Sequence, residues 1–395
     1  MMPSSKPTIH REALEALACE LVRTPSPSTQ EGAVAELVAA EMRDLGYDEV
    51  RVDAMGNVIG RIGSEEGPRL VFNGHMDTID VGDREMWRHD PYAGLVRDGV
   101  LYGRGASDMK GGLAAMIHAA GALVPLREQL QGSLYVVGVV QEEPCEGLAM
   151  RHVVEQEGVR PTWVVLGEAT NLQICRGQRG RMEMEVIVRG RSCHAAAPER
   201  GVNAIYEVAR FVFGMQLLAP QLPNDSFLGR GTIAATGVRS EAGSHNVIPD
   251  CCVTHIDRRL TIGETETKAL TEIRRILTRE AIQAEVRVPF YRSISYTGFE
   301  AEGRKVFPYW ITPDDDPLLR QTAATIENVL GYLPRLGRWD FSTDGVYTMG
   351  VAGIPTIGFG PGEERHTHTV EDQVRLADVY AAAQVYAQLA LRMLR

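Results

Sequence analysis

The sequence predicts an α/β protein whose mostly parallel sheet is covered by helices on both faces and which carries an inserted α+β domain. Its 395 residues exceed what one ordinary hydrophobic core holds, so two domains are expected. Strand-like and helical periods alternate in the first 180 residues, which is typical of a parallel sheet. Near Arg181 the period changes to a strand with one polar face. We therefore expect one domain built from residues 1–180 and 293–395, with residues 181–292 inserted.

Local patterns place the elements of the first part of the chain. Apolar residues recur at near-helical spacing in 9–21 and 34–45, and Gly46 ends the second helix. A third helix is expected at 111–123. The run 134–140 is nearly all apolar, as a strand covered on both faces would be. The expected strands are 49–52, 57–62, 69–72, 134–140 and 163–166.

The inserted segment has a secondary-structure order of its own. Met182, Met184 and Val186 alternate with charged residues, which indicates a strand with one wet face. The pattern continues as helix, two strands, helix and strand, and this βαββαβ order is the ferredoxin-like one. The expected elements after the first strand are 203–218, 232–238, 252–256, 265–281 and 285–289.

The last part of the chain completes the first domain. Helical patterns cover 317–330 and 377–394, and an apolar run at 354–359 predicts a strand between them. The segment from Phe299 to Asp316 shows no clear period, so we expect a long functional loop there.

Composition excludes several classes of protein. The formal net charge of −11 argues against a nucleic-acid or anionic-membrane partner, because both require clustered Lys and Arg. No apolar run approaches the roughly 20 residues that span a bilayer, and the segment from Met1 to Arg11 lacks the apolar stretch of a secretory signal. A cytoplasmic location is therefore expected. Six cysteines without a C-x-x-C pair disfavour a structural zinc site or a disulfide framework.

Acidic and histidine side chains follow the predicted strands. His75 and Asp77 come after the strand 69–72 at i and i+2, so they share a side if the chain is extended. Alone, this pair is more often an ordinary loop histidine with a nearby acid. Glu142 and Glu143 follow a buried strand, at the edge where open α/β sheets place their sites. One of them could bind a metal while the other activates a water, whereas on a surface they would only repel each other.

Three further segments extend this pattern. Glycines surround Asp108 just before a helix, a course suited to a carboxylate that reaches two cations, to a phosphate loop or to a helix N-cap. Glu168 follows the strand 163–166, where a lone glutamate would be unremarkable. His366 and His368 precede another acidic pair, and their spacing does not select between them. Several strand ends that each present His, Asp or Glu are the distribution expected of a two-metal hydrolase.

Eight short strings resemble, in order, one family of zinc metallopeptidases and deacylases. They are NGHMDTID, GRGASDMKGG, VVQEEPCEG, LGEATN, SCHAAAPERGVNAI, SHNVIPD, IDRRLTIGET and GFGPGEERHTHTVED. The family includes aminoacylase, acetylornithine deacetylase, succinyl-diaminopimelate desuccinylase and glutamate carboxypeptidase. RGRMEMEV and APERGVNAIY are most similar to its branch named for selenium-metabolism hydrolases. The resemblance implies a catalytic domain with an inserted lid or dimerisation domain.

The resemblance also implies a role for each matching position. The implied metal ligands are His75, Asp108, Glu143, Glu168 and His368. Asp108 is shared: it joins His75 and Glu168 at one zinc, and Glu143 and His368 at the other. Glu142 matches the general base, and Asp77 the residue that orients His75. The string THTVED selects His368 over His366, although Glu371-Asp372 stands where the family has Asp or Asn followed by Glu.

Three more matches lie in the inserted segment. His194 corresponds to a histidine that reaches across a homodimer and polarises the scissile carbonyl in the other subunit. Asn246 and Arg259 correspond to positions that bind the substrate, and Arg259 would do so by a bidentate hydrogen bond with a carboxylate. From the residues alone, a loop histidine, a turn asparagine and an arginine in a surface ion pair are the simpler interpretations.

The function implied by the resemblance is a dinuclear zinc-dependent hydrolase, in which Co²⁺ or Mn²⁺ could replace zinc. It would cleave the amide bond of an N-acyl amino acid or a small peptide-like substrate with a free carboxylate. Glu168 favours this choice, because the family has Glu there in deacylases and carboxypeptidases, and Asp in many aminopeptidases and dipeptidases. A metal-dependent dipeptidase or aminopeptidase and a non-catalytic metal-binding relative are the alternatives. The absence of a G-x-S-x-G elbow disfavours a serine hydrolase.

Overall fold

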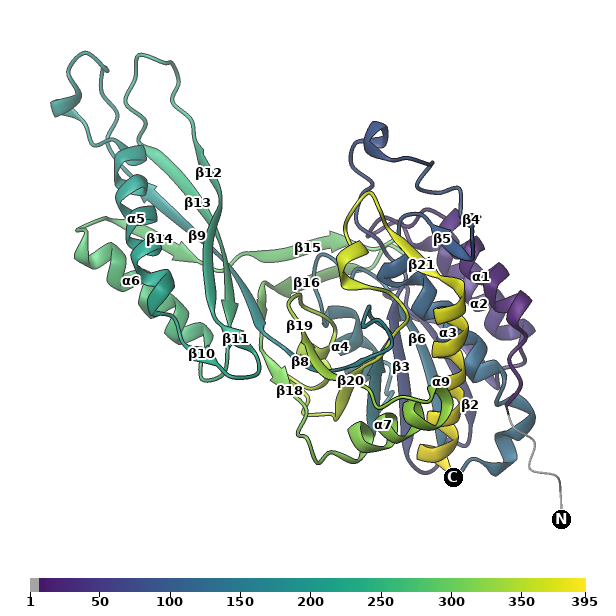
Figure 1. Ribbon diagram of the computed structural model, residues 1–395. Coiled ribbons are helices and arrows are strands. Elements are labelled where there is room, and N and C mark those ends of the chain that lie inside the picture. Colours follow the sequence, from purple (N-terminus) through teal and green to yellow (C-terminus); the bar gives the residue numbers. More distant parts are fainter. Residues whose placement is uncertain (1–6) are drawn as a thin grey trace.

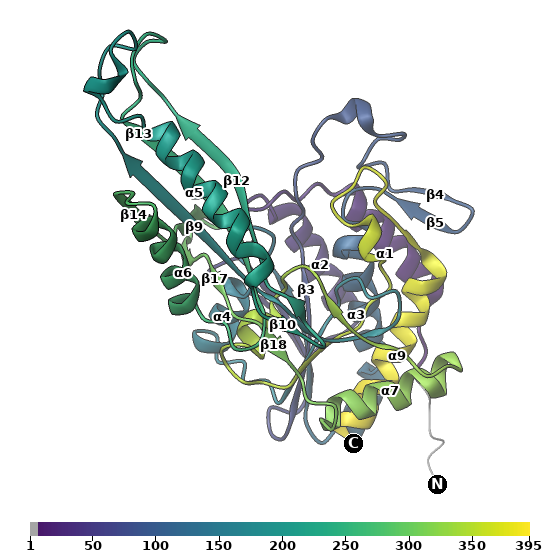
Figure 2. The ribbon, with the colours of Figure 1, turned by 60° about the vertical axis from the view of Figure 1, so that its left-hand side comes forward.

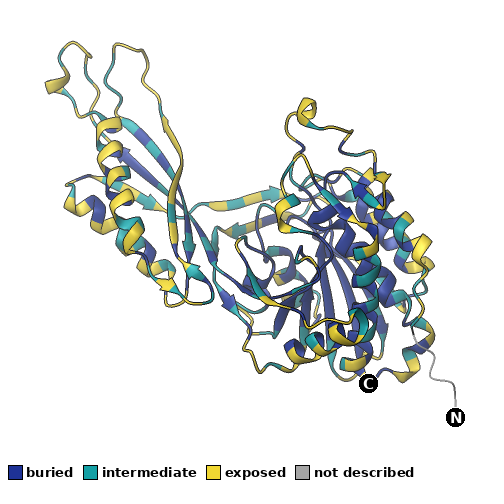
Figure 3. Cartoon of the chain, in the orientation of Figure 1, coloured by how far each residue is buried: buried dark blue, intermediate teal, exposed yellow. Residues whose placement is uncertain are grey.

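In the computed structural model, which describes residues 7–395, the chain forms two bodies of different shape (Figures 1 and 2). The larger body holds a nine-stranded sheet, and the smaller one holds a five-stranded sheet and extends away from it. Figure 3 shows that the buried residues are concentrated along the strands of the larger body. Among the described residues, no helix is both long and apolar enough to cross a membrane.

The nine-stranded sheet has its parallel strands at the centre. In order across the sheet these are β6 (Ser133–Val139), β3 (Arg69–His75), β7 (Trp163–Leu166) and β20 (Thr356–Gly358). The strands added at both edges pair antiparallel, except β19, which runs parallel to its neighbour β8. The edge strands are β1 (Glu49–Val52), β2 (Val58–Gly63), β8 (Ile174–Gln178), β18 (Trp310–Ile311) and β19 (Leu336–Trp339). The central strands are buried along almost their whole length, as the apolar runs predicted.

Helices complete the larger body. The long ones are α1 (Arg11–Arg23), α2 (Gly32–Asp44), α3 (Gly111–Gly121), α7 (Pro317–Leu330) and α9 (Leu376–Leu394), and the short ones are α4 (Leu148–Glu155) and α8 (Gly345–Thr348). In Figure 2, α3 and α9 lie on one side of β3 and α4 on the other, so helices cover both faces. The rings of Phe72 on β3 and Tyr386 on α9 meet at 5.1 Å, which joins sheet and helix in one core. The predicted α/β class is confirmed.

Minor elements bring distant segments together. A three-stranded sheet of β4 (Leu95–Arg97), β5 (Val100–Tyr102) and β21 (Gln373–Arg375) holds the segment before α9 beside the loop before α3. That loop contains a π-helical turn at Ala106–Lys110. The short 3-10 turns are Arg84–Met86, Val124–Gln129, Pro198–Arg200, Ala219–Gln221 and Glu364–His366.

The smaller body has the predicted βαββαβ order. Its elements are β9 (Gly180–Arg189), α5 (Ala204–Leu218), β12 (Thr232–Ser240), β13 (Cys251–Leu260), α6 (Glu266–Arg279) and β14 (Ala284–Arg287). The strands pair antiparallel in the order β12-β13-β9-β14, and the short pair β10 (Asn224–Asp225) and β11 (Gly229–Arg230) lies beside them. Met182, Met184, Phe211, Ile256 and Ile273 form part of a separate core. This confirms an inserted ferredoxin-like domain.

One predicted element is wrong. The segment Phe299–Asp316, expected as a long loop, contains β16 (Glu300–Arg304), β17 (Val306–Phe307) and β18. β16 pairs with β15 (Phe290–Ile294), and β17 returns to β9, so the five-stranded sheet includes residues beyond 292. These strands are short, and β16 is largely polar, so they carry no apolar alternation that a sequence pattern could reveal.

Candidate metal centre

The site forms where the parallel strands of the larger sheet end. His75 is the last residue of β3, and Glu142 and Glu168 follow β6 and β7. Because β3, β6 and β7 are parallel neighbours, their carboxyl ends lie at one edge of the sheet. Asp108 comes from the loop before α3, and His368 from the loop before β21.

Asp108 lies between two histidines. Its Oδ1 is 2.9 Å from Nε2 of His75, and its Oδ2 is 3.2 Å from Nε2 of His368. Glu168 Oε1 is 3.7 Å from Nε2 of His75, and Glu143 Oε2 is 2.9 Å from Nε2 of His368. The structure thus brings all five predicted ligands together, with the acidic oxygens grouped around two imidazoles.

Burial in this site raises the pKa of the acids and lowers the pKa of the histidines, but nearby carboxylates raise both. Burial raises the pKa of Glu142 and Glu168 well above the ordinary value, and neighbouring carboxylates raise it further. The hydrogen bonds of His368 with Asp108 and Glu143 raise the pKa of that histidine to about 10. Burial lowers the pKa of His75, but the hydrogen bond with Asp108 and the charge of Glu168 outweigh it and raise that pKa. Without bound cations, protons take the place of the positive charge that the acids require.

The residues fit a pair of divalent cations. Asp108, Glu142, Glu143 and Glu168 are four carboxylates in one buried group, and two divalent ions would supply four positive charges. Glu142 Oε1 is buried and has no hydrogen-bond partner among the described residues. Carboxylate oxygens and imidazole nitrogens suit zinc, cobalt and manganese alike, so this donor set does not choose between these metals.

Asp77 hydrogen-bonds His75 through its main chain, and its carboxylate Oδ1 also lies 3.7 Å from Nδ1 of that histidine. The main-chain oxygen of Asp77 is 2.8 Å from Nδ1 of His75 and accepts the Nδ1 proton, which leaves Nε2 free to face Asp108. The carboxylate accepts the Ser28 hydroxyl at 2.6 Å, and the main-chain N–H groups of Glu142 at 3.1 Å and Glu143 at 3.3 Å. Asp77 therefore holds the acidic pair as well as the histidine.

Asp372 is a residue whose role the sequence left open. Its carboxylate accepts the N–H groups of Gly105 at 2.7 Å and Ser107 at 2.8 Å, and pairs with Arg104 at 3.3 Å. Burial raises its pKa to about 7, against the effect of these three donors. Asp372 fixes the loop that carries Asp108. The departure from the family pattern at Glu371-Asp372 was the signal in the sequence.

Asp344 was missed by the sequence analysis. It is 2% exposed, and its carboxylate accepts Asn73 Nδ2 at 2.9 Å and the N–H of Gly147 at 2.7 Å. Burial raises its pKa to about 6. It lies in a stretch with no period of its own, so only the fold places it beside the strand that ends at His75.

The inserted-domain residues do not join this group within the chain. His194 and Asn246 are exposed, and their segments are linked by the hydrogen bond from Ala195 N–H to Asn246 O at 2.8 Å. Their loops lie at the end of the domain farthest from the nine-stranded sheet (Figure 1). Arg259 is on β13 and pairs with Asp257 at 2.8 Å. Partial burial lowers the pKa of Arg179, between the two sheets, and the charges of Arg338 and Arg259 lower it further.

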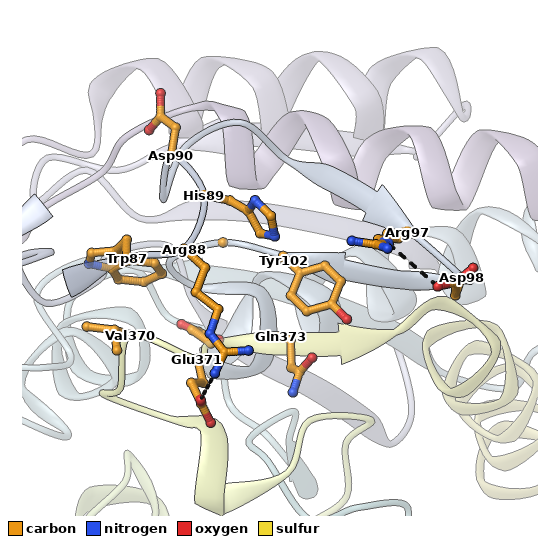
Figure 4. A pocket seen from close by; sticks show the side chains of 12 residues that line it. Trp87, Arg88, His89, Asp90, Arg97, Asp98, Tyr102, Val370, Glu371 and Gln373 are labelled. Atoms are coloured by element: carbon orange, nitrogen blue, oxygen red, sulfur yellow. Dashed lines mark ion pairs between the residues drawn. The ribbon is translucent and has the colours of Figure 1, made fainter. Parts of the chain in front are cut away.

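A cavity of about 440 Å³ lies between the segments 87–103 and 370–373 (Figure 4). None of the five candidate ligands lines it, although Asp372 does. Figure 4 shows the ion pair of Arg88 and Glu371, at 3.7 Å, among the side chains that line the cavity. The other lining side chains that Figure 4 labels are Trp87, His89, Asp90, Arg97, Asp98, Tyr102, Val370 and Gln373.

Comparison with known proteins places the chain in a family. Residues 71–392 match the family described as peptidase family M20/M25/M40. The uncharacterised protein YgeY of Escherichia coli K12 is 40% identical over 376 residues, which cover 95% of this chain and 93% of that protein. Succinyl-diaminopimelate desuccinylase of Thioalkalivibrio sulfidiphilus is 26% identical over 388 residues, with coverage of 96% and 98%. The Bacillus subtilis protein YXEP, a dinuclear metal-binding peptidase, shares the fold with a TM-score of 0.72 at 18% identity, covering 97% of this chain and 98% of that one. The chain therefore belongs to peptidase family M20/M25/M40 and is a hydrolase of the metallopeptidase type.

Proposed function

We propose that the protein is a dinuclear zinc hydrolase that cleaves the amide bond of an N-acyl amino acid or a small peptide-like substrate with a free carboxylate. The observation that carries this proposal is the geometry of Asp108, whose two oxygens face two different histidines. A carboxylate in that position can bridge two ions. The B. subtilis protein of the same fold is a dinuclear metal-binding peptidase, which agrees with this arrangement.

The proposed ligand sets are those that the family resemblance implies, and the distances agree with them. His75, Asp108 and Glu168 would hold one ion, and Asp108, Glu143 and His368 the other. When bound, two such ions lower the pKa of water and stabilise negative charge on the carbonyl oxygen. The main-chain oxygen of Asp77 keeps His75 in the tautomer that a ligand requires.

Glu142 is the proposed general base. It is 5% exposed, and its unpartnered Oε1 is free to accept a proton. In the metal-free protein burial raises its pKa, and the charges of Glu168 and Asp344 raise it further. Two bound cations would offset these carboxylate charges and keep Glu142 ionised, as a general base requires. It would take a proton from the attacking water and return it to the leaving nitrogen.

The substrate class rests on charge and on one relative. Arg179 and Arg259 lie near each other between the two sheets, paired with Asp340 at 3.3 Å and with Asp257 at 2.8 Å. A free carboxylate on the substrate could replace the Asp257 partner of Arg259. The relative at 26% identity is named a succinyl-diaminopimelate desuccinylase, which favours an acyl amide. Glu168 agrees with the deacylase and carboxypeptidase pattern described above.

An activity screen tests the function. Zinc-loaded protein is assayed on N-acetyl and N-succinyl amino acids, on dipeptides and on free-amine substrates, with cobalt and manganese in parallel. We expect the acylated amino acids to be cleaved fastest. Glu142→Gln should still bind two ions and lose about 10²–10⁴-fold in kcat. Faster cleavage of free-amine dipeptides would replace the deacylase with a dipeptidase, and near-normal turnover by Glu142→Gln would remove that residue from its role.

We further propose that a second copy of the chain completes the site. Among the described residues, β12 pairs with β13 alone, so its other edge is free. Four apolar side chains are exposed on the helix α5, which packs over β12 and β13: Ile205, Tyr206, Phe213 and Leu217. A homodimer through this edge and helix would cover both, and would present His194 and Asn246 to the other subunit.

Complementation tests the dimer. Light scattering should give twice the mass of the chain. His194→Ala and Glu142→Gln should each be nearly inactive. An equal mixture of the two should regain up to about a quarter of wild-type activity, because about half of its dimers are mixed and one of the two sites in each mixed dimer has both native residues. A mixture as inactive as its components would place His194 in the site of its own chain.

A further inference from the structure

A β-hairpin connects the inserted domain with the metal centre. Strands β15 and β16 form a two-stranded sheet of their own, here called the arm (residues 290–304). The chain enters the arm from β14 and leaves it through β17, and both of those strands pair with β9. The arm is therefore rooted in the five-stranded sheet, and Figure 1 shows it reaching across to the larger body.

The tip of the arm is fixed to the larger body. The ring of Tyr296 lies against Gly32 and Gly56, where an added Cβ would come within 3.2 Å and 2.4 Å of it. Its hydroxyl donates to the Gly56 carbonyl at 2.9 Å, and Thr297 donates to the Ala54 carbonyl at 2.6 Å. The arm is thus held at both ends, by a sheet on one side and by the β1–β2 turn on the other.

Between these ends the arm holds the residue before the acidic pair. The Tyr291 hydroxyl donates to Gln141 Oε1 at 2.7 Å, and the Ser293 hydroxyl donates to the same oxygen. Gln141 is fully buried and has φ of 55°, in the left-handed region that a non-glycine residue rarely adopts. Its N–H donates to Glu31 Oε1 at 3.1 Å. Such a conformation persists only when its surroundings fix it.

The residues after the acidic pair are held from the same side. Lys305, one residue past the arm, donates to the Pro144 carbonyl. A Cβ on Gly303 would lie 2.8 Å from Cys145 Sγ, so the strand β16 packs directly on the chain at Cys145. The arm and its last connection therefore contact the chain on both sides of Glu142 and Glu143, through the side chains of Gln141 and Cys145 and the carbonyl of Pro144.

We propose that the arm positions Glu142 and Glu143 in the metal centre, with Tyr291 and Ser293 as positioning residues. The inference rests on the proposed function, in which Glu142 is the base and Glu143 a ligand. Partners that orient ligands from outside the site govern both metal affinity and turnover, and small misplacements of a reacting group are costly. No other described side chain donates to Gln141 Oε1.

The alternation of the strand supplies a matched control. Tyr291 and Ser293 point toward Gln141, whereas Arg292 between them is 72% exposed and pairs with Glu302 on the outer face. Arg292→Gln therefore changes the same strand without touching the acidic pair. Ser293→Thr keeps the hydroxyl and serves as the conservative variant.

The test compares zinc binding and turnover in the double variant Tyr291→Phe/Ser293→Ala. Zinc chloride is titrated into metal-free protein in a calorimeter, and kcat and KM are measured on the best substrate of the screen. We expect one of the two binding steps, that of the ion held by Glu143, to lose about 10- to 100-fold in affinity and the other to change less than about twofold. kcat should fall about 10- to 100-fold at unchanged KM. Arg292→Gln and Ser293→Thr should match the wild type.

The outcomes separate the two proposals. If wild-type protein binds two ions but the double variant binds both with wild-type affinity and keeps its kcat, the arm does not position the acidic pair. Equal losses in both binding steps, or the same losses in Arg292→Gln, would show a general loosening of the fold and would also overturn the inference. If wild-type protein binds two ions and cleaves no amide, the proposed function fails, and the binding data still decide the role of the arm. If it binds no second ion, both proposals fail.

Discussion

Replacing Asp372 by asparagine tests whether the carboxylate of Asp372 holds the loop that carries Asp108. At pH 8 the side chain is above the pKa of about 7 that burial gives it, and it is a carboxylate. One oxygen accepts the N–H of Ser107, and the other accepts the N–H of Gly105 and contacts Arg104. The Asp372 side chain that provides both acceptor oxygens is completely buried.

Asparagine has the same shape but one acceptor oxygen. If that oxygen faces Gly105 and Arg104, the amide NH₂ faces the N–H of Ser107, and one buried backbone donor stays unpaired. Leaving such a donor unpaired costs about 1–3 kcal/mol. Because the cost falls on local contacts of one loop, we expect it to appear as easier local opening and not as loss of the whole fold.

Hydrogen–deuterium exchange measures this directly. For metal-free protein at pH 8, the amides of the segment 103–108 should exchange about 5- to 150-fold faster in Asp372→Asn than in the wild type, the range that corresponds to that free energy. Glu371→Gln is the control, because Glu371 is exposed and only contacts Arg88 at 3.7 Å. Exchange of the 103–108 amides within twofold of the wild type would refute the argument that Asp372 fixes this loop.

Three other predictions concern metal removal, the dependence of stability on pH, and the packing of a glycine in the sheet. Removing metal with a chelator should abolish activity and lower the thermal midpoint, because the buried carboxylates lose their counter-charge. Zinc at 100 times its dissociation constant should restore about 2.7 kcal/mol of stability per site. A thermal midpoint that the chelator does not change would contradict this. In metal-free protein, burial raises the pKa of Glu31 to about 7 and of Asp344 to about 6, so the folded state binds these protons more tightly than the unfolded chain. The stability that these two groups contribute should be fully present below about pH 4 and lost as pH rises to about 7. The urea midpoint of the wild type relative to Glu31→Gln/Asp344→Asn should therefore fall over that window, and a relative rise would count against it. Gly358→Ala places a Cβ 1.8 Å from the Trp339 ring and should lower the urea midpoint by an amount worth at least about 1–3 kcal/mol, whereas Gly243→Ala, in open space, should not.

Elements with strong local signals could be predicted from the sequence. The helix expected at 317–330 is α7 (Pro317–Leu330), and capping residues mark both of its ends in the sequence. The Asp316 side chain accepts the N–H of Leu318, and Gly331 adopts φ of 81° after the last turn. The apolar runs of β6 and β7 were predicted for a similar reason, since burial on both faces leaves a continuous run.

His75, Glu143 and Glu168 could be gathered because each one ends or follows such a strand, whereas Asp108 lies in a loop before a helix and His368 was selected by the family resemblance. Parallel strands end at one edge, so the sequence order His75, Glu142, Glu168 already indicates proximity. The roles of Asp344 and Asp372 could not be derived in this way. Each acts through backbone groups far away in sequence, such as the N–H of Gly147 for Asp344, and no local period records such a contact.

The arm was missed for the same physical reason, and its position has a consequence for how the two bodies move. β8 ends at Gln178 and β9 begins at Gly180, so Arg179 alone joins the two sheets on the way out. On the way back, two residues separate β17 from β18. The arm is a third connection, made of contacts instead of covalent bonds.

This third connection is stiff. The Lys305 N–H donates to the Pro289 carbonyl at 3.1 Å and closes the root, and the ladder from Phe290 to Arg304 continues to the docked tip. A hydrogen-bonded ladder fixed at both ends cannot lengthen, so a rotation of the inserted domain about Arg179 has to undock Tyr296 or displace the chain at Gln141. In the second case the orientation of the inserted domain, and of any second subunit bound to it, sets the position of the acidic pair.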